Sequence, residues 1–365
     1  MFQGIHSLTI FLFSRAKMTK LICRSYMMTP KNNVFECRIL EHVPQNKPKN
    51  GNVFWPQGLF AFGGHSREAT VTDSKFIDAS TLVVAVRNSA KLYLFTLSNQ
   101  QMQCVDTLQL KCPDGTYKHP DLFVLSPDKR RIYVTLYRSD VVVVDLIVKR
   151  PSPTMVPTTA FAYRGCIPTA FPGHAYHGCF CMDNTLYLGN VHSESVSNTV
   201  ITTLDMVDLG TLHQTSHIVQ GARIKAIAVT RKYIVLGLDG KTRQTPLLFD
   251  STIEVYARGN GEAQIGRSIG SVIRFRHSQL DGMCLAIVAD KTYIFATIHD
   301  DDTQKGYIVV IAFDESSGQM RTVTKYACAS FPHGIDVYQN KLVYTSYADS
   351  SVVIMDNVNA LISNV

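Results

Sequence analysis

The sequence predicts an all-β protein, a β-propeller of four-stranded antiparallel blades. Three observations predict this fold class: a pattern that recurs about every 50 to 60 residues, β-rich runs within each period, and the lack of a convincing helical stripe in the repeats. The chain has 365 residues, of which 45% are hydrophobic, so it can bury a large core. A ring of similar units is therefore expected.

The repeat is clearest where segments align without a gap. HGIDVYQNKLVYT (333–345) matches HGCFCMDNTLYLG (177–189) at a His, a Gly, an Asn and a Leu. KAIAVTRKYIVLG (225–237) fits the same pattern, and DGMCLAIVADKTYIFAT (281–297) shares its opening, with a polar residue before a small one. These segments define four copies of one unit.

Two further copies are weaker. HPDLFVLSPDKRRIYVTLYRSDVVVVD (119–145) keeps the later apolar strands, and the first copy opens with QGLFAF (57–62). An insertion at 63–80 is expected to interrupt that first copy before TLVVAV (81–86) resumes it. The repeat units therefore start near 57, 119, 177, 225, 281 and 333.

Each unit divides into short runs of β-branched and aromatic residues separated by turn residues. The fifth unit shows four such runs: MCLAIV, TYIFATI, YIVVIAF and MRTVTKY. Runs of this composition favour strands. Four antiparallel strands in about 50 residues are typical of one propeller blade.

The last unit lacks a clear outer strand, because little chain remains after VVIMD (352–356). NVFECRIL (33–40) is strand-like and has no blade of its own, so we expect this N-terminal strand to close the ring. Such a closure removes an open sheet edge. The alternative is that 19–28 and 33–40 form a separate irregular blade, which makes seven; six is favoured.

The chain divides into a leader and one domain. Residues 1–17 are expected to be a disordered leader, because Met18 opens a cleaner start, and residues 18–365 form a single propeller. SLTIFLF (7–13) is not interpreted as a signal peptide, since no Lys or Arg precedes it and Arg15 follows it. No run approaches the roughly 18 apolar residues of a membrane span. We expect a soluble, cytoplasmic protein.

Charge and cysteine content exclude few functions. The 36 Lys and Arg against 29 Asp and Glu give +7, a mild bias without the dense basic stripe of a dedicated nucleic-acid binder. The nine cysteines form an odd set without paired CxxC motifs, so most are expected to be packed thiols in a reducing compartment. Cys179 and Cys181 share a strand face and are expected to be core residues rather than metal ligands.

Two stretches resemble known propeller repeats. PHGIDVYQNKLVYTSYADSSVVIMD (332–356) resembles an NHL repeat, and SPDKRRIYVTLYRSDVVVVDL (126–146) resembles the YVTN repeat of lactonase-like propellers. The sequence departs from these patterns at Ser346, where an Asp is usual, and at Ala226, where a Gly is usual. The resemblance implies a propeller and leaves the reaction open, since one fold hosts many functions.

The polar residue before each glycine is the candidate site. In a propeller the first strand of each blade lines the central channel, and a glycine there allows close approach of neighbouring backbones. The preceding polar residues are therefore expected near one channel mouth, once per blade. Around the ring they are Gln57, His119, His177, Lys225, Asp281 and His333.

Three functions are compatible with this ring. The leading hypothesis is a scaffold that binds a protein partner or a small polar ligand at the mouth, because no phosphate loop, GxSxG elbow or HExxH motif occurs. The alternative is a metal-assisted hydrolase or lyase, in which His119, His177 and His333 hold zinc or a similar ion. The resemblance allows this chemistry, since some relatives of the repeat type are zinc lyases.

In the alternative, Asp281 or Lys225 lies near the substrate. A third hypothesis is binding of single-stranded RNA along a basic face, as some NHL-type propellers do.

Overall fold

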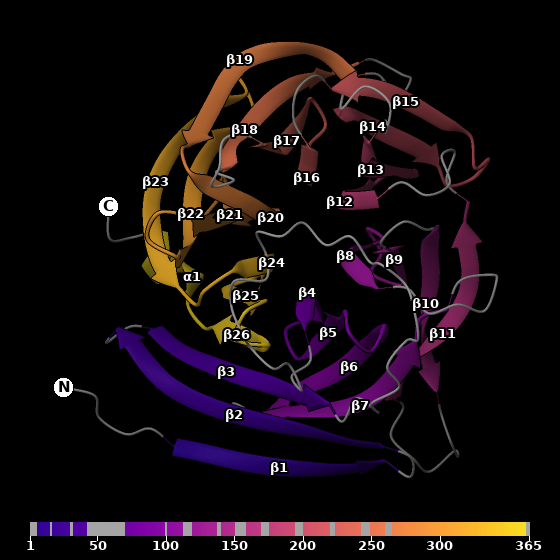
Figure 1. Ribbon diagram of the computed structural model, residues 1–365, viewed down its shortest axis with the longest axis vertical. Coiled ribbons are helices and arrows are strands. Elements are labelled where there is room, and N and C mark those ends of the chain that lie inside the picture. Colours follow the sequence, from indigo (N-terminus) through magenta and orange to yellow (C-terminus); the bar gives the residue numbers. More distant parts are fainter. Residues whose placement is uncertain are drawn as a thin grey trace.

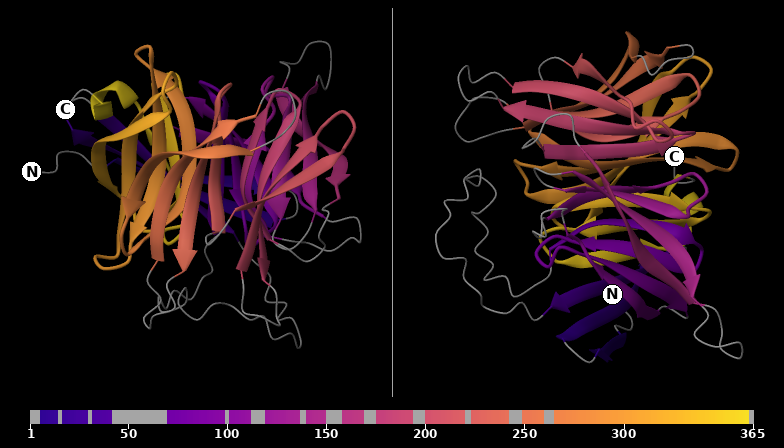
Figure 2. Two further views of the ribbon diagram at one scale, coloured as in Figure 1. Left: turned by 90° about the horizontal axis from the view of Figure 1, so that it is seen from above. Right: turned by 90° about the vertical axis from the view of Figure 1, so that its right-hand side faces the viewer.

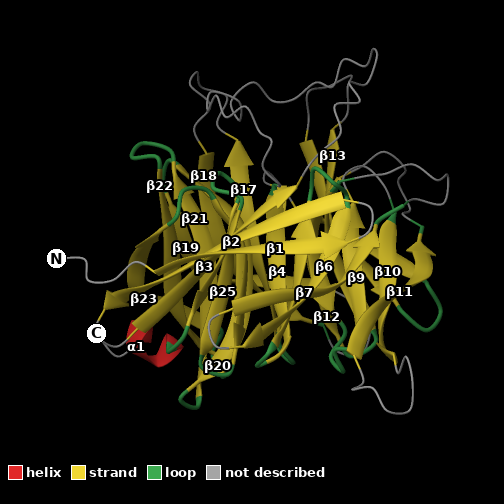
Figure 3. Ribbon diagram, turned by 90° about the horizontal axis from the view of Figure 1, so that it is seen from below, coloured by secondary structure: helices red, strands yellow, loops and turns green. Residues whose placement is uncertain are grey.

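The computed structural model of the 365-residue chain is almost entirely β-structure (Figure 3). The residues that it describes are 6–14, 17–29, 32–41, 70–98, 101–111, 119–136, 140–149, 158–168, 175–193, 200–219, 223–241, 249–259 and 265–362. In this part of the chain the one helix is α1 (Val358–Ile362), and no helix is long and apolar enough to cross a membrane.

The strands form six antiparallel sheets, of which five have four strands each in chain order. The first contains β4 (Val71–Asp78), β5 (Thr81–Val86), β6 (Lys91–Ser98) and β7 (Gln101–Gln109). The second contains β8 (Pro120–Leu125), β9 (Arg131–Leu136), β10 (Val141–Lys149) and β11 (Thr158–Ile167). The third contains β12 (Ala175–Met182), β13 (Thr185–Ser193), β14 (Val200–Asp208) and β15 (Gln214–Val219).

The fourth sheet contains β16 (Arg223–Val229), β17 (Tyr233–Lys241), β18 (Phe249–Arg258) and β19 (Ile265–Phe275). The fifth contains β20 (Ser278–Val288), β21 (Lys291–Asp300), β22 (Lys305–Asp314) and β23 (Gln319–Cys328). The sixth has six strands: β24 (Pro332–Tyr338), β25 (Lys341–Ser346), β26 (Ser351–Met355), β3 (Asn32–Glu41), β2 (Lys17–Thr29) and β1 (His6–Ser14).

The six sheets are the blades of a closed ring. The innermost strands β4, β8, β12, β16, β20 and β24 each contact the next, and β24 contacts β4 (Figure 1). Viewed from the side, the sheets stand next to one another around the ring axis (Figure 2). The prediction of a six-bladed propeller is confirmed, and the alternative of a separate seventh blade is wrong because β2 and β3 join the sixth sheet.

The N-terminal strand closes the ring as the sequence predicts. β3 pairs with β26 in antiparallel register, with Phe35 opposite Ile354. Within residues 1–17, where the sequence analysis expected a disordered leader, His6–Ser14 forms β1 and pairs with β2. The physical reason is the run SLTIFLF, whose β-branched and aromatic residues favour a strand once a partner strand lies beside it.

The first blade corrects a second expectation. Its innermost strand, β4 (Val71–Asp78), lies inside the segment that the sequence analysis assigned to an insertion at 63–80. The sequence VTDSKFID does not look like a buried strand because it contains the charged residues Asp73 and Lys75. In the structure both side chains point into the ring interior and form an ion pair there. The segment QGLFAF (57–62) lies outside the described residues.

The hydrophobic core is divided into six clusters, and each cluster lies between two neighbouring blades. Successive side chains of a strand point to opposite faces of the blade, so each strand contributes to two clusters. Val84 and Val86 of β5 pack toward the sixth blade, whereas Val83 and Ala85 pack toward the second. Each blade therefore depends on both neighbours for its burial.

The cysteines are mostly packed thiols. Six in the described part of the chain are free, namely Cys104, Cys166, Cys179, Cys181, Cys284 and Cys328. Cys37 is the exception, because it is disulfide-bonded, and Cys23 is the residue opposite it in the register of β2 and β3.

Candidate functional site in the central channel

Every innermost strand contains a β-bulge near its beginning, where its pairing with the second strand of the blade shifts by one residue. In three strands the pairing identifies the extra residue directly: Thr72 in β4, Lys225 in β16 and Asp281 in β20. A bulge takes a side chain out of the regular alternation of the sheet and re-aims it. The ring therefore repeats one local irregularity six times.

A shared hydrogen bond places the bulge in two more strands. The residue after Asp281 donates its backbone N–H to the hydroxyl of Thr297 at 2.8 Å. Gly334 donates in the same way to Thr345 at 2.8 Å, and Leu122 donates to Thr135 at 3.2 Å. The bulge residues of β24 and β8 are therefore the residues just before them, His333 and Asp121.

In β12 the gap in pairing falls at His177 and Gly178, and the gapless alignment with 333–345 gives His177 as the bulge residue. We call the six bulge residues the bulge ring. They are Thr72, Asp121, His177, Lys225, Asp281 and His333.

Four of the six residues predicted from the sequence occupy the bulge ring. The exceptions belong to the first two blades. His119 lies two residues before Asp121, and its ring Nδ1 is 2.8 Å from the carbonyl oxygen of Arg87. Gln57 lies outside the described residues, and Thr72 holds the corresponding place in the first blade.

The bulge ring ties neighbouring blades together. Lys225 Nζ lies 2.9 Å from Asp281 Oδ1 and joins the fourth blade to the fifth. His177 Nδ1 lies 2.6 Å from Asp121 Oδ2 and joins the third to the second. His333 Nδ1 lies 2.8 Å from the carbonyl oxygen of Thr72 and joins the sixth to the first.

These pairs are buried, which perturbs their titration. Burial would raise the pKa of Asp281, but Lys225, His333 and Gln279 outweigh it and lower that pKa to about 2. Burial also opposes ionisation of Asp121, yet His177, His333 and Arg87 hold the pKa of this carboxyl well below its usual range. Both carboxylates are therefore ionised at neutral pH.

The predicted zinc ligands do not fit a metal ion in this arrangement. Within the described residues, no three His, Cys, Asp or Glu side chains come together in a way that could hold a metal. The Nδ1 atoms of His119, His177 and His333 each face a different oxygen, on Arg87, Asp121 and Thr72 respectively. These histidines therefore do not support a metal-assisted reaction in this arrangement.

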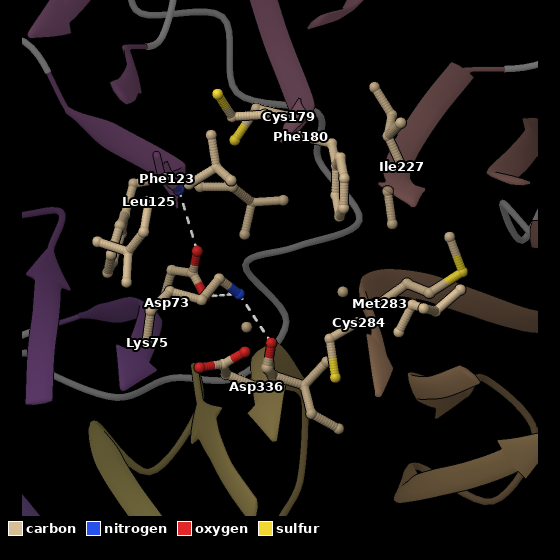
Figure 4. Close-up of a pocket in the computed structure, with 18 of the residues that line it drawn as sticks. Asp73, Lys75, Phe123, Leu125, Cys179, Phe180, Ile227, Met283, Cys284 and Asp336 are labelled. Carbon is tan, nitrogen blue, oxygen red and sulfur yellow. Dashed lines mark hydrogen bonds and ion pairs between the residues drawn. The ribbon is translucent and has the colours of Figure 1, made fainter. Parts of the chain in front are cut away.

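A cavity of about 260 Å³ lies in the channel next to the bulge ring (Figure 4). Its walls come from all six innermost strands, and on each of them the lining residues follow the bulge residue along the chain. In Figure 4, Asp73, Lys75 and Asp336 lie together with Phe123 and Leu125 beside them, and Phe180, Ile227 and Met283 lie across the cavity from these charged side chains. We call this space the channel cavity.

The charged side of the channel cavity is built around one lysine. Lys75 Nζ lies 3.0 Å from Asp73 Oδ1 and donates to the carbonyl oxygen of Ile335 at 2.7 Å. Asp73 is fully buried, and its other oxygen accepts the backbone N–H of Phe123 at 3.0 Å. Asp73 and Lys75 thus satisfy each other.

Asp336 is the second carboxylate of this side. Its Oδ2 accepts the backbone N–H of Phe76 at 2.8 Å. No donor among the described residues reaches its other oxygen, Oδ1. Burial raises the pKa of Asp336, although Lys75 opposes this rise. Among the described residues, Oδ1 of Asp336 therefore has no hydrogen-bond donor.

The opposite side of the channel cavity is apolar. Phe180, Ile227 and Met283 line it together with the thiols of Cys179 and Cys284. Burial raises the pKa of both thiols well above the ordinary value, so they stay neutral at physiological pH. Sequence analysis did not find this site, because no motif marks residues that converge from six separate strands.

Comparison with known proteins gives a fold likeness and no family. No family model matches the chain, and no curated protein matches it. Among solved structures, the β-propeller domain of Myceliophteria thermophila Cps50 (Swd1) has a TM-score of 0.47 at 10% identity, covering 97% of this chain and 98% of that one.

The WD40 repeats of RRP9 have a TM-score of 0.46 at 10% identity, covering 80% of this chain and 96% of that one. A PQQ-bound aldose sugar dehydrogenase from Streptomyces coelicolor has a TM-score of 0.45 at 12% identity, covering 79% and 94%. At such values the likeness carries no argument about function.

Proposed function

We propose that this protein is a ligand-binding propeller that holds a small molecule in the channel cavity. The observation that carries the proposal is the free acceptor of Asp336, which shares a cavity of about 260 Å³ with an apolar wall of Phe180, Ile227 and Met283. Mostly apolar pockets with a few placed polar groups are typical of small-molecule sites. The volume of about 260 Å³ lies just below the usual range of about 300 to 1,000 Å³, which favours a compact ligand.

The bulge ring supports this proposal as the frame of the site. Its polar groups are already paired between blades, as in Lys225 with Asp281 and His177 with Asp121. Paired groups fix the spacing of the innermost strands, and a binding site needs walls of fixed spacing. The ring then positions the channel cavity instead of contacting the ligand.

A thermal-shift screen with small polar and apolar compounds tests the proposal. Leu285 lines the channel cavity and is partly exposed, so Leu285→Trp fills part of the space. Ile287, two residues further along the same strand, is 68% exposed and does not line it, so Ile287→Trp is the matched control.

A compound present at 100 times its Kd stabilises the folded state by about 2.7 kcal/mol. We expect such compounds to raise the melting temperature of the wild type and of Ile287→Trp, and to leave Leu285→Trp unchanged. Compounds that stabilise Leu285→Trp as strongly as the wild type would show that the channel cavity is not the site. A screen without any stabilising compound would also count against the proposal.

The finer predictions from the sequence stay predictions. They are the NHL or YVTN type of the repeats, a cytoplasmic location, and a protein partner at the channel mouth. Binding of RNA is also open to test, by measuring the affinity for mixed-sequence single strands against salt concentration. The metal-assisted reaction is not proposed, because no three His, Cys, Asp or Glu side chains of the described residues form a group that could hold a metal ion.

A further inference from the structure

The free oxygen of Asp336 indicates what kind of group the ligand presents. A carboxylate has about four lone-pair positions, and Oδ2 of Asp336 uses one of them for the backbone N–H of Phe76. Asp336 is partly exposed, so its Oδ1 can accept a hydrogen bond from water or from a ligand in the cavity. The ligand is therefore expected to donate a hydrogen bond to Oδ1.

The charges around Asp336 favour a cationic donor. The Lys75 ammonium forms its ion pair with Asp73, at 3.0 Å, and within the described residues no ion pair reaches Asp336. Lys129 also lines the cavity, but it donates to the carbonyl oxygen of Phe76 at 3.0 Å and lies 3.9 Å from the centre of the Tyr338 ring. Burial raises the pKa of Asp336, and Lys75 and Lys129 both lie near enough to oppose this rise, but among the described residues neither forms an ion pair with it. An ammonium ion in the cavity would give Asp336 the ion-pair partner that it lacks among these residues.

The apolar wall of the channel cavity indicates that the rest of the ligand is a hydrocarbon group. Phe180 lines the channel cavity across from the charged side chains and offers a large apolar ring for a hydrocarbon group. Met283 and Ile227 offer a flexible and a branched apolar surface for a hydrocarbon group. A cavity of about 260 Å³ has room for one ring or a short chain.

We infer that the ligand is a small primary amine, bound as its ammonium ion, which donates an N–H to Asp336 Oδ1 and packs its apolar body against Phe180 and Met283. This inference rests on the proposed function and names its ligand class. It assigns Asp336 as the residue that distinguishes amines from alcohols of the same shape.

Calorimetric titration of the wild type with matched pairs of compounds tests the inference. The amines are butylamine, cyclohexylamine and benzylamine, and the partners are butanol, cyclohexanol and benzyl alcohol, all at one salt concentration. We expect at least one amine to bind at least tenfold more tightly than its alcohol. Asp336→Asn keeps an acceptor for Phe76 and removes the charge, and should weaken the amine at least tenfold.

Asp356→Asn is the matched control, because Asp356 lies on the surface with its side chain 46% exposed. This variant should bind the amine as the wild type does. If Asp336→Asn does not fold, as judged by circular dichroism, the comparison of amine with alcohol on the wild type decides alone.

The outcomes separate the inference from the function on which it rests. Equal binding of an amine and its alcohol, or binding of other library compounds when no amine binds, overturns the amine class and leaves the ligand-binding function standing. If neither the amines nor any library compound binds, both are wrong.

Discussion

The ion pair between Lys225 and Asp281 allows the sharpest prediction about stability. The side chains are 9% and 4% exposed, and their charged atoms lie 2.9 Å apart between the fourth and fifth blades. Removing one partner of a buried pair leaves the other charge uncompensated and costs about 3 to 5 kcal/mol. Lys225→Met should therefore destabilise the ring by this amount.

The expected shift in melting temperature follows from the size of the chain. Unfolding entropy is about 2.1 cal/mol/K per residue, which for 365 residues is roughly 0.8 kcal/mol/K. The loss of about 3 to 5 kcal/mol then lowers the melting temperature by about 4 to 6 °C. Differential scanning calorimetry measures this shift directly.

Two further variants make the result specific to the buried pair. Lys341→Met removes an exposed partner of Asp356, 3.9 Å away, and should lower the melting temperature by no more than about 1 °C. The double variant Lys225→Met/Asp281→Asn should recover most of the loss, because no unmatched charge remains. A shift below 1 °C in Lys225→Met, or losses that simply add in the double variant, would refute the reasoning.

Three other predictions concern the ring. A methyl group at Gly282 would clash with the His333 carbonyl oxygen, so Gly282→Ala should cost about 1 to 3 kcal/mol in urea unfolding; a neutral result contradicts close packing there. The pKa of Asp281 is lowered to about 2 from 3.8, so about 2 kcal/mol of stability is present above pH 4 and disappears as the pH falls through 2; an unchanged unfolding free energy from pH 4 to 2 opposes this. Ile39→Ala should lower the free energy of unfolding by about 2 to 5 kcal/mol, whereas Ile218→Ala, at a side chain that is 71% exposed, should change it little. Equal effects of the two variants would show that Ile39 of β3 is not packed in the core.

The sequence predicted the blades because their period and composition are local properties. It also predicted the closure, since NVFECRIL (33–40) was a strand without a blade. It missed β4, because Asp73 and Lys75 look like loop residues. Their burial depends on partners about 50 and 260 residues away, Phe123 and Ile335, which no local pattern reveals.

The bulge ring was predicted where a small residue marks it. The His-Gly and Asp-Gly pairs located His177, Asp281 and His333. In the second blade Leu122 replaces the glycine, so the analysis chose His119 and missed Asp121. A signal was present in Thr135, which occupies the same place as Thr297 and Thr345 and bonds the residue after the bulge.

The channel cavity could not be predicted from the sequence. Asp336 lies in the most recognisable repeat, yet its free oxygen becomes significant only because Phe180, Ile227 and Met283 face it from other blades. Side chains that far apart in the chain are brought together by ring closure alone.

A crystal structure of the protein soaked with cyclohexylamine tests the central claim most directly, because it places the ligand. The account predicts density in the channel cavity, with the nitrogen within hydrogen-bond distance of Asp336 Oδ1 and the ring against Phe180 and Met283. Density for the amine at another site, with the channel cavity filled by water alone, would contradict it.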